Sequence, residues 1–367
     1  MINKSYSTTY LLTKPYDDSL QYGNDGKVTN NTKFAINNAI FNIKNSKIIG
    51  KQQDTFETML FLPEGEGRQG EGGLRTKGYF KHSYNMVDGE WWIVDSDNNP
   101  VIPAPEDIQF KIKQYLTSTA QHQTHSTYLP LITVITVVYN GAKYLEETIL
   151  SVINQTYPNV EYIIIDGGST DGTIDIIKKY EDYIDYWVSE KDKGIYDAMN
   201  KGITLCFGEI VGIINSDDWY EKDAFDKVIN SMNQNEGDIY YGNMTIISEK
   251  TKQELEKRYT NEKKLYFGMY LNHPSTFVKL KVYKKFDLFD AKNFKIAADY
   301  DLLLRNKING SSFFLIDDCL AYMRDNGVSV KTMELTKMET EMVRKKNLSF
   351  IIYHFTKFIK FIRKTTK

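Results

Sequence analysis

The sequence predicts an α/β fold built on a Rossmann-like, mostly parallel central sheet with helices on both faces. Two segments in succession, beginning near residues 131 and 162, each combine a short apolar run, a polar loop and a helical pattern. Successive β-α units imply parallel strands joined by right-handed crossovers. Acidic residues directly follow two of the apolar runs, and ligands bind at the carboxyl ends of strands in such sheets.

Residues 1–128 are polar, and we expect an irregular region of turns and short strands, with one strand at 90–95 (EWWIVD). The glycine cluster at 63–78 (PEGEGRQGEGGLRTKG) does not match GxxxxGK[ST] and follows no apolar strand, so a P-loop is excluded and a flexible linker is favoured. His122 and His125 are three residues apart, but no further ligand lies near them, so we do not expect a metal site there.

The predicted catalytic region, residues 129–330, opens with a β-branched strand over 131–138 (LITVITVV). A helical pattern through Tyr144, Ile149 and Ile153 follows and ends at the turn signal TYPN. The later predicted elements are, in order, a strand at 162–165, a helix at 174–180, a short strand at 187–188, a helix at 197–206 and a strand at 210–214.

Residues 331–367 form a predicted helical, basic tail, since residues 344–367 carry eight lysine and arginine residues and no acidic residue. One face of this helix is apolar and another is basic, as the residues at helical spacing show: Ile351, Ile352, Phe355, Phe358, Ile359 and Ile362 against Lys357, Lys360 and Lys364. This pattern predicts peripheral contact with an anionic membrane through residues 348–367. The alternative is a helix docked on the catalytic region or on a dimer partner.

Charge and cysteine content narrow the function classes. The chain has 46 basic and 48 acidic residues, so no overall field favours a nucleic-acid partner. Its two cysteines cannot form a disulfide framework, which favours a reducing, cytoplasmic environment. No signal-peptide core and no run of about 18 apolar residues is present, so we expect neither export by that route nor a membrane-spanning helix.

Carboxylates gather at the predicted strand ends: Asp166 after the second apolar run, and Asp217 and Asp218 after the fourth. Two adjacent acids repel each other and favour a cation, so the pair can bind Mg²⁺ or Mn²⁺ with a diphosphate completing the coordination. The alternative is that Asp217 or Asp218 caps a helix starting at Trp219. The role of the loop DGGSTDGT is also undecided, since the loop can cap a helix or admit a ligand close to its glycines.

Five segments together resemble the successive signatures of inverting glycosyltransferases of family 2, which have the GT-A fold. In chain order they are VITVVYNGAKYLEETILSVINQTYPNVEYIIIDGGSTDGT, SEKDKGIYDAMNKGI, GIINSDDWY, NHPSTF and AADYDLLLR. The resemblance runs from about residue 131 to residue 324 and covers neither residues 1–128 nor the tail. It implies a nucleotide-sugar donor and a metal-dependent transfer.

Carried over residue by residue, the resemblance implies a donor site. Asp166 would hydrogen-bond the nucleobase, and the other implied donor-site residues are Thr136, Val138, Asn140, Asp192, Asn200, Ser216 and Asp217. The chain departs from the family pattern at three positions. Gly167 and Asn215 stand where members carry aspartates, and Ala298 replaces a glutamate.

The resemblance also implies the reactive groups. Asp217, with Asp218 beside it, would hold the Mn²⁺ or Mg²⁺ ion, and Asp299 would be the catalytic base. His273 stands where members often have a histidine near the acceptor or the metal. Direct displacement needs a base for the acceptor hydroxyl, and burial can raise the pKa of Asp299 to suit that task. The alternative for the acids at 299 and 301 is a solvated helix start, with Asp301 paired to Arg305.

We therefore expect an inverting glycosyltransferase, peripheral on the inner face of the cell membrane, that transfers a sugar from a UDP-sugar to a lipid-linked or polysaccharide-precursor acceptor. Self-association stays open. A sugar nucleotidyltransferase would need a GxGxRxxPLT-like loop after the first strand, and VVYNGAKYLEE is not one. A catalytically silent module that binds nucleotide sugar or glycan is the other alternative, suggested by Gly167, Asn215 and Ala298.

Overall fold

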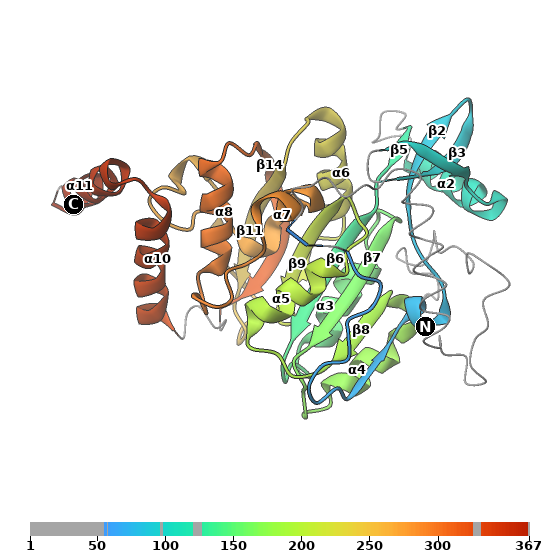
Figure 1. Ribbon diagram of the computed structural model, residues 1–367, viewed down its shortest axis with the longest axis horizontal. Helices are drawn as coiled ribbons and strands as arrows, with labels where there is room; N and C mark the ends of the chain where they lie inside the picture. The colour runs from blue at the N-terminus through green and yellow to red at the C-terminus, as the bar shows by residue number, and fades with distance from the viewer. Residues whose placement is uncertain (1–54, 57, 96–97, 120–126, 326–331, 366–367) are drawn as a thin grey trace.

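The computed structural model describes residues 55–56, 58–95, 98–119, 127–325 and 332–365, and the paired histidines of 122–125 lie outside them. A ten-stranded sheet forms the centre of the described molecule (Figure 1). Its strand order is β1-β8-β7-β6-β9-β13-β11-β14-β10, with β12 paired to β11. A separate four-stranded sheet stands at one end of the molecule, and the last two helices stand at the other.

The predicted parallel sheet is the continuous block β8-β7-β6-β9. Val138 lies opposite Asp166, and Val137 lies opposite Asn215, so the polar strand ends meet at one edge. The chain leaves β6 for β7 and β8 on one side and returns to β9 on the other, and ligands bind at such a reversal. The observed bounds are β6 Ile132–Val138, β7 Val160–Asp166, β8 Tyr186–Ser189 and β9 Ile210–Asn215.

The second half of the sheet mixes strand directions. β13 (Thr276–Lys279) runs antiparallel between β9 and β11 (Ile239–Ile247), and β14 (Phe313–Arg324) runs parallel to β11. β10 (Trp219–Tyr220) and β12 (Glu254–Arg258) add antiparallel edges.

Alternate residues of each strand enter two cores, one on each face of the sheet. Ile132 and Val134 join one core, and Ile135 and Val137 join the other. The first core is closed by α3 (Leu145–Ile153), α4 (Thr173–Lys179) and α6 (Ala224–Gln234). The second is closed by α5 (Ile195–Thr204), α7 (Leu280–Phe286) and α8 (Ala298–Ile308). Short 3₁₀ turns lie at Glu181–Tyr183, Glu262–Lys264 and His273–Ser275.

The region before residue 129 is more regular than the sequence predicts. The strand expected at 90–95 is β3, and it joins an antiparallel sheet in the order β4-β3-β2-β5 beside helix α2. The apolar stripe of α2, Ile108, Ile112 and Tyr115, is buried in the first core. These three residues have helical spacing, which predicts a helix, but the residues around them are mostly polar and mask the pattern. The bounds are β2 Ser83–Val87, β3 Glu90–Val94, β4 Pro100–Pro103, β5 Tyr128–Leu129 and α2 Glu106–Thr119.

The glycine cluster is ordered, so its interpretation as a flexible linker is wrong for the described residues. β1 (Gly70–Gly72) pairs antiparallel with β8, and the 3₁₀ helix η2 (Leu74–Lys77) follows. A methyl group on Gly72 would approach the Trp187 indole nitrogen to 2.5 Å, so glycine lets this strand lie on the tryptophan. The central sheet therefore includes residues from outside the predicted 129–330 region.

The tail is helical, as predicted, and divides into α10 (Met333–Asn347) and α11 (Phe350–Thr365). α10 packs beside α8, and α11 extends beyond it at the end of the molecule (Figure 1). Among the described residues, no helix combines the length and the apolarity needed to cross a membrane.

Candidate active site

Asn140 joins the loops that follow β6 and β7. Its backbone N–H donates to Ser169 Oγ at 2.7 Å, and its side-chain oxygen accepts the N–H of Thr170 at 2.9 Å. Its φ of 50° lies in the left-handed region, which asparagine tolerates better than most residues. Tyr139 beside it is 66% exposed, so an aromatic ring stands open at this edge of the sheet. The exposed position of Asn140 fits the donor-site role that the resemblance implies.

Thr136 and Val138, the two predicted donor-site residues that belong to β6, lie deeper than Asn140. Thr136 is fully buried, and its hydroxyl lies 3.0 Å from that of Tyr162, which places it beneath the site instead of at its border. Val138 is also buried, but its carbonyl accepts the N–H of Gly167 at 2.9 Å and so fixes the start of the next loop. Within the structure, both residues support the edge of the sheet without facing solvent.

Asp166 organises the loop after β7. Its fully buried carboxylate accepts the N–H groups of Gly168 at 3.1 Å and Ser169 at 2.9 Å, and the hydroxyl of Ser189 at 2.6 Å. The Ser169 hydroxyl donates to its other oxygen. Three of these four hydrogen bonds fall on Oδ2, so Oδ1 keeps capacity for a further donor. The structure gives Asp166 the role of shaping the loop.

Asp192 lies against the glycine that departs from the family pattern. A methyl group on Gly167 would approach Asp192 Oδ2 to 2.4 Å, so an aspartate at 167 would collide with this carboxylate. Asp192 Oδ1 accepts the N–H of Gly194 at 2.8 Å. Burial raises the pKa of Asp192, and the negative charges of Asp197 and Asp166 add to that rise. Asp192 thus supplies a carboxylate at the position from which one is missing in the loop.

Gln69, from the segment before β1, reaches the same loop and was missed by the sequence analysis. Its backbone N–H donates to Ser189 O at 2.8 Å, and a methyl group on Gly168 would lie 3.6 Å from its side-chain nitrogen. Tyr139, Asp192 and Gln69 therefore border the two glycines with an aromatic ring, a carboxylate and an amide. No sequence signal connects Gln69 with a loop so distant in the chain.

The turn after β9 offers oxygen atoms for a cation. Trp219 begins strand β10, and α6 starts at Ala224, so the prediction of a helix capped by Asp217 or Asp218 at residue 219 is wrong. The Asn215 side-chain oxygen is buried without a hydrogen-bond partner, and Asp218 beside it is 2% exposed. Burial raises the pKa of Asp218 well above its ordinary range, and the charge of Asp217 raises it further.

This donor set suits a hard divalent ion. An orphaned amide oxygen and two carboxyl groups are ligands of the type that Mg²⁺ and Mn²⁺ prefer. Among the described residues, no group of three or more His, Cys, Asp or Glu side chains could hold a metal by itself. A metal at this turn would therefore need further oxygen ligands, and a diphosphate can provide them. Ser216 lies on the same turn, close to Gly141 of the loop after β6.

Arg324, at the end of β14, holds the turn after β9 in place, and no sequence motif points to it. Its guanidinium donates to the carbonyl of Asp217 and to Glu147 Oε2, the latter at 2.5 Å. It stacks on the Trp219 ring at 4.6 Å and on the Tyr144 ring at 4.2 Å. A buried arginine held on four sides is a rigid support, and its charge opposes the rise in the pKa of Asp218.

Asp299 and His273 line one small cavity of about 10 Å³, room for about one water molecule. Ile213 of β9 also lines it, two residues before Asn215, which brings this pair to the same end of the sheet as the turn. The ring nitrogen Nε2 of His273 is buried without a hydrogen-bond partner. Asp299 Oδ1 accepts the hydroxyl of Tyr196 at 3.1 Å and the N–H of Tyr300 at 2.8 Å.

The environment of Asp299 suits a base. Burial raises the pKa of its carboxyl, while His273, the Tyr300 N–H and the Tyr196 hydroxyl oppose that rise. Burial lowers the pKa of His273, so its neutral form is favoured. A carboxylate whose pKa is raised takes up a proton more readily than an exposed one. The interpretation of Asp299 as part of a solvated helix start therefore does not hold.

Asn200 clasps the loop that leads to α8. Its side chain donates to Phe289 O at 2.9 Å and accepts Phe289 N–H at 3.0 Å. Phe289 in turn separates the small cavity from a larger one of about 700 Å³ that Asn200, Lys193 and Arg305 also line. The two hydrogen bonds of the Asn200 side chain thus fix an aromatic wall beside Asp299.

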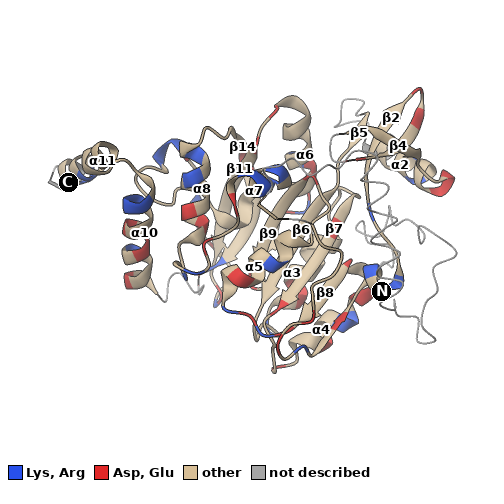
Figure 2. Ribbon diagram, in the orientation of Figure 1, with Lys and Arg blue, Asp and Glu red and all other residues tan. Residues whose placement is uncertain are grey.

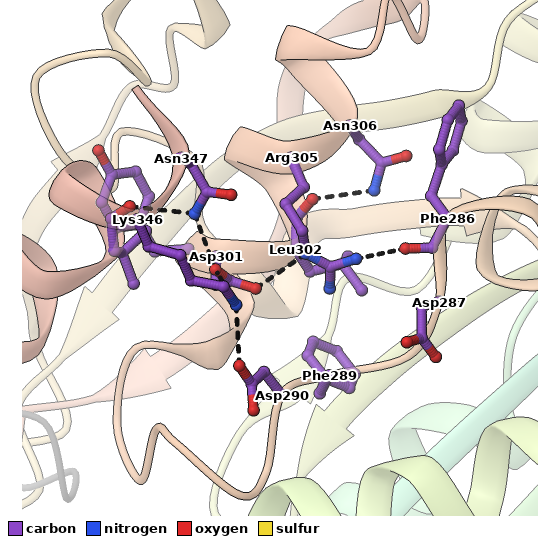
Figure 3. A network of polar contacts seen from close by, with 12 residues as sticks. Phe286, Asp287, Phe289, Asp290, Asp301, Leu302, Arg305, Asn306, Lys346 and Asn347 are labelled. Carbon is purple, nitrogen blue, oxygen red and sulfur yellow. Dashed lines mark hydrogen bonds and ion pairs between the residues drawn. The ribbon is translucent and has the colours of Figure 1, made fainter. Parts of the chain in front are cut away.

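Asp301 is structural, as the alternative interpretation held, but it is buried and not solvated. Its buried carboxylate accepts hydrogen bonds from Arg305 Nε at 2.8 Å and Asn347 Nδ2 at 2.8 Å (Figure 3). It also forms an ion pair with Lys346 Nζ at 3.0 Å. Lys346 also pairs with Asp290 at 2.8 Å on the loop that carries Phe289. This network ties α8, α10 and the loop between α7 and α8 into one unit.

Glu339 of α10 holds the segment that starts α8 and is a third residue missed from sequence. Its buried carboxylate accepts the backbone N–H groups of Lys295 at 3.0 Å, Ile296 at 2.8 Å and Ala297 at 3.0 Å. Asp299 follows two residues later. A carboxylate at exposed N–H groups of a helix start is stabilising, so α10 fixes the position of Asp299.

Comparison with known proteins shows to which class this protein belongs. Residues 133–326 match the sequence profile of "Glycosyl transferase family 2". An uncharacterized glycosyltransferase of Rickettsia typhi is 32% identical over 230 residues, which cover 58% of this chain and 70% of the relative. The putative teichuronic acid biosynthesis glycosyltransferase TuaG of Bacillus subtilis is 40% identical over 106 residues, 28% of this chain and 42% of that protein. Among solved structures, S. aureus TarS 1-349 in complex with UDP-GlcNAc has a TM-score of 0.48 at 19% identity, covering 58% of this chain and 64% of that one.

The matches define the class of the protein as a glycosyltransferase. The profile covers more than half of the chain, and the chain belongs to glycosyl transferase family 2. The resemblance stated from the sequence is thus confirmed, together with the α/β fold of that family.

Proposed function

We propose that this glycosyltransferase transfers a sugar, with inversion at the anomeric carbon, from a UDP-sugar to a hydroxyl group of a lipid-linked or polysaccharide-precursor acceptor. The observation that carries the proposal is the meeting of Asp299 with the polar end of β9. Asp299 shares a cavity with Ile213, two residues before the Asn215–Asp218 turn. One edge of the sheet would thus carry both the base and the oxygen ligands of the metal. The putative teichuronic acid role in the name of TuaG supports a surface-polysaccharide acceptor.

The donor would bind across the loops after β6, β7 and β9. Tyr139 offers an exposed ring for the nucleobase, and Asp192 and Gln69 offer a carboxylate and an amide for its polar edge. Asn140 and Asp166 would keep these loops in place through the bonds described above. The Asn215 oxygen, Asp217 and Asp218 would hold a Mn²⁺ or Mg²⁺ ion, which when bound stabilises negative charge on a leaving diphosphate.

The acceptor would enter beside Phe289. Asp299 would take the proton of its hydroxyl group while the hydroxyl oxygen attacks the anomeric carbon, and one displacement inverts the configuration. Tyr196 and the Tyr300 N–H keep the carboxylate oriented through hydrogen bonds to Oδ1. The partly buried site limits access of water, which would otherwise compete as acceptor. We place this reaction on the cytoplasmic side of the membrane.

The test is release of nucleoside diphosphate from a panel of UDP-, GDP- and dTDP-sugars, with Mn²⁺ or EDTA and a membrane-extract acceptor. We expect release from a UDP-sugar, lost with EDTA and in Asp217→Ala and Asp299→Asn. The matched control is Asp175→Asn, an exposed carboxylate on α4, which should keep full activity. Release that survives Asp299→Asn would overturn the assignment of the base. Donor binding without release with any acceptor would favour a silent binding module.

A further inference from the structure

Helix α11 carries an exposed apolar face from Phe350 to Ile362. Phe350 and Ile351 are 78% and 79% exposed, and Phe355 and Phe358 are 61% and 60% exposed. Single exposed apolar residues are common, but a contiguous patch marks a surface that contacts a partner or a membrane. These residues recur at helical spacing, so they form one stripe.

The opposite face of α11 is anchored, so the orientation of the stripe is fixed. Arg344 of α10 is 1% exposed, and it donates to Thr356 Oγ1 at 2.6 Å. The Tyr353 hydroxyl donates to Glu341 at 2.5 Å, and its ring lies 5.4 Å from the Arg344 guanidinium. A buried arginine with these partners makes the junction specific, and the stripe therefore faces away from the body.

The charge around the stripe identifies its partner. Residues 344–367 contain no acidic residue, and Figure 2 shows α11 without acidic positions. Lys357 and Lys360 are exposed on a different side of the helix from the stripe. Two copies of this surface would bring like charges together, whereas anionic headgroups would neutralise them. The 16 residues of α11 span about 24 Å, and no described helix can cross a bilayer, so the fitting geometry is along the surface.

We propose that α11 binds an anionic lipid surface, with its apolar stripe among the acyl chains and its lysines at the headgroups. The binding itself does not depend on glycosyl transfer. Its consequence for the acceptor rests on the proposed function: α10 links α11 to α8, the helix that carries Asp299, so a membrane-bound α11 would hold the catalytic region at the surface where a lipid-linked acceptor lies.

The test is co-sedimentation of the full chain with vesicles of phosphatidylcholine, with and without phosphatidylglycerol, over a range of salt concentrations. We expect binding to the anionic vesicles that weakens with salt. Phe355→Ser with Phe358→Ser should lower the vesicle-bound partition at least about tenfold. Phe110→Ser, at a site on α2 that is equally exposed at 61%, should leave it unchanged. Lys357→Glu with Lys360→Glu should weaken binding to the anionic vesicles, and Lys178→Glu on α4 should not.

Circular dichroism and thermal melting establish that each variant is folded, since the changed side chains are exposed. Equal binding of wild type and the Phe355/Phe358 variant would overturn the proposal, as would the absence of binding to both vesicle types. A dimer in light scattering that is lost in this variant, without vesicle binding, would assign the stripe to self-association and also overturn it. Because no step of this assay uses donor or turnover, its outcome is independent of the failure or success of the proposed reaction.

Discussion

At the scale of the residue, Asp299 shows how a folded environment prepares a side chain for chemistry. Its pKa is raised by burial, and the Tyr196 hydroxyl and the Tyr300 N–H favour the charged form without cancelling that effect. The result is a carboxylate that takes up a proton more readily than an exposed aspartate does.

We predict that kcat/KM falls at acidic pH with a midpoint above the value of about 3.9 that an exposed aspartate has, because the base must be ionised. Asp299→Asn should lower kcat by about a hundredfold or more and leave the Kd of the donor nearly unchanged. Steady-state kinetics and calorimetric donor titration measure both. An acid limb at the ordinary aspartate value would contradict the effect of burial.

The stability of the same variant relative to the wild type should rise with pH. A carboxyl whose pKa is raised in the folded state stabilises the fold below its unfolded pKa, and this contribution is lost as pH rises through the folded value. Asparagine has no charge to bury and keeps an oxygen for the two bonds to Oδ1. We therefore expect the Tm of Asp299→Asn to equal that of wild type at low pH and exceed it at neutral pH. A lower Tm at neutral pH would be the opposite result.

Gln69→Ala should raise the KM for the donor roughly threefold to tenfold with kcat little changed, since one hydrogen bond to the nucleotide would be lost. Glu64→Ala, an exposed change in the same segment, is the matched control and should have the wild-type KM. Initial rates over a range of donor concentrations distinguish the two. An equal effect of both variants would assign Gln69 to folding of the segment and not to the donor.

At the scale of the element, one helix from outside the family profile positions a helix inside it. The profile ends at residue 326, yet α10 supplies Glu339 to the start of α8 and Asn347 to Asp301. The helix that bears Asp299 thus gets its position from the tail. An isolated α8 would leave the N–H groups of 295–297 without these partners.

We predict that Glu339→Gln lowers kcat more than it affects the KM for the donor, because the base would be misplaced while the donor loops stay intact. The variant keeps the size of the side chain but loses the charge and one acceptor oxygen, so the free energy of unfolding should fall by about 1–3 kcal/mol. Glu334→Gln on the same helix, exposed and paired with Lys337, should change neither. An equal loss of donor affinity in Glu339→Gln would indicate general unfolding instead.

At the scale of the whole molecule, the segment before β2 belongs to the same folding unit as the catalytic sheet. Arg75 and Glu161 form an ion pair at 2.6 Å, and both are almost fully buried. Arg75 also donates to the carbonyl of Leu205 at 2.8 Å, and Lys81 pairs with the buried Asp185 at 2.8 Å. Buried charges without partners are costly, so the two parts of the chain depend on each other.

We predict that Arg75→Met destabilises the whole protein by about 3–5 kcal/mol, because it leaves Glu161 buried and unpaired. Unfolding in urea should stay a single transition with a lower midpoint. Lys77→Met is the control, since its pair with Asp182 is exposed and should contribute less than about 1 kcal/mol. Two separate transitions in the wild type would show that the segment folds independently.

The sequence predicts the parallel block well because each of its strands and helices is encoded by a local apolar period. It also identifies Asp217 as an acid directly after a strand, whereas Asp299, at the start of α8, is singled out by the family resemblance and not by a strand end. It does not predict that Ser189 holds the Asp166 carboxylate or that Asn200 clasps Phe289, because those contacts depend on partners distant in the chain.

The pairing of β1 with β8 protects one edge of the sheet while the chain is being synthesised. The residues of β8, Tyr186–Ser189, are all buried, and β1 covers the side of that strand which would otherwise be the open border of the sheet. An uncovered apolar border can pair with another chain and lead to aggregation. Because Gly70–Gly72 leave the ribosome well before β8, the protecting strand is already available when the vulnerable one emerges. The order of synthesis thus keeps newly made copies apart in a crowded cell.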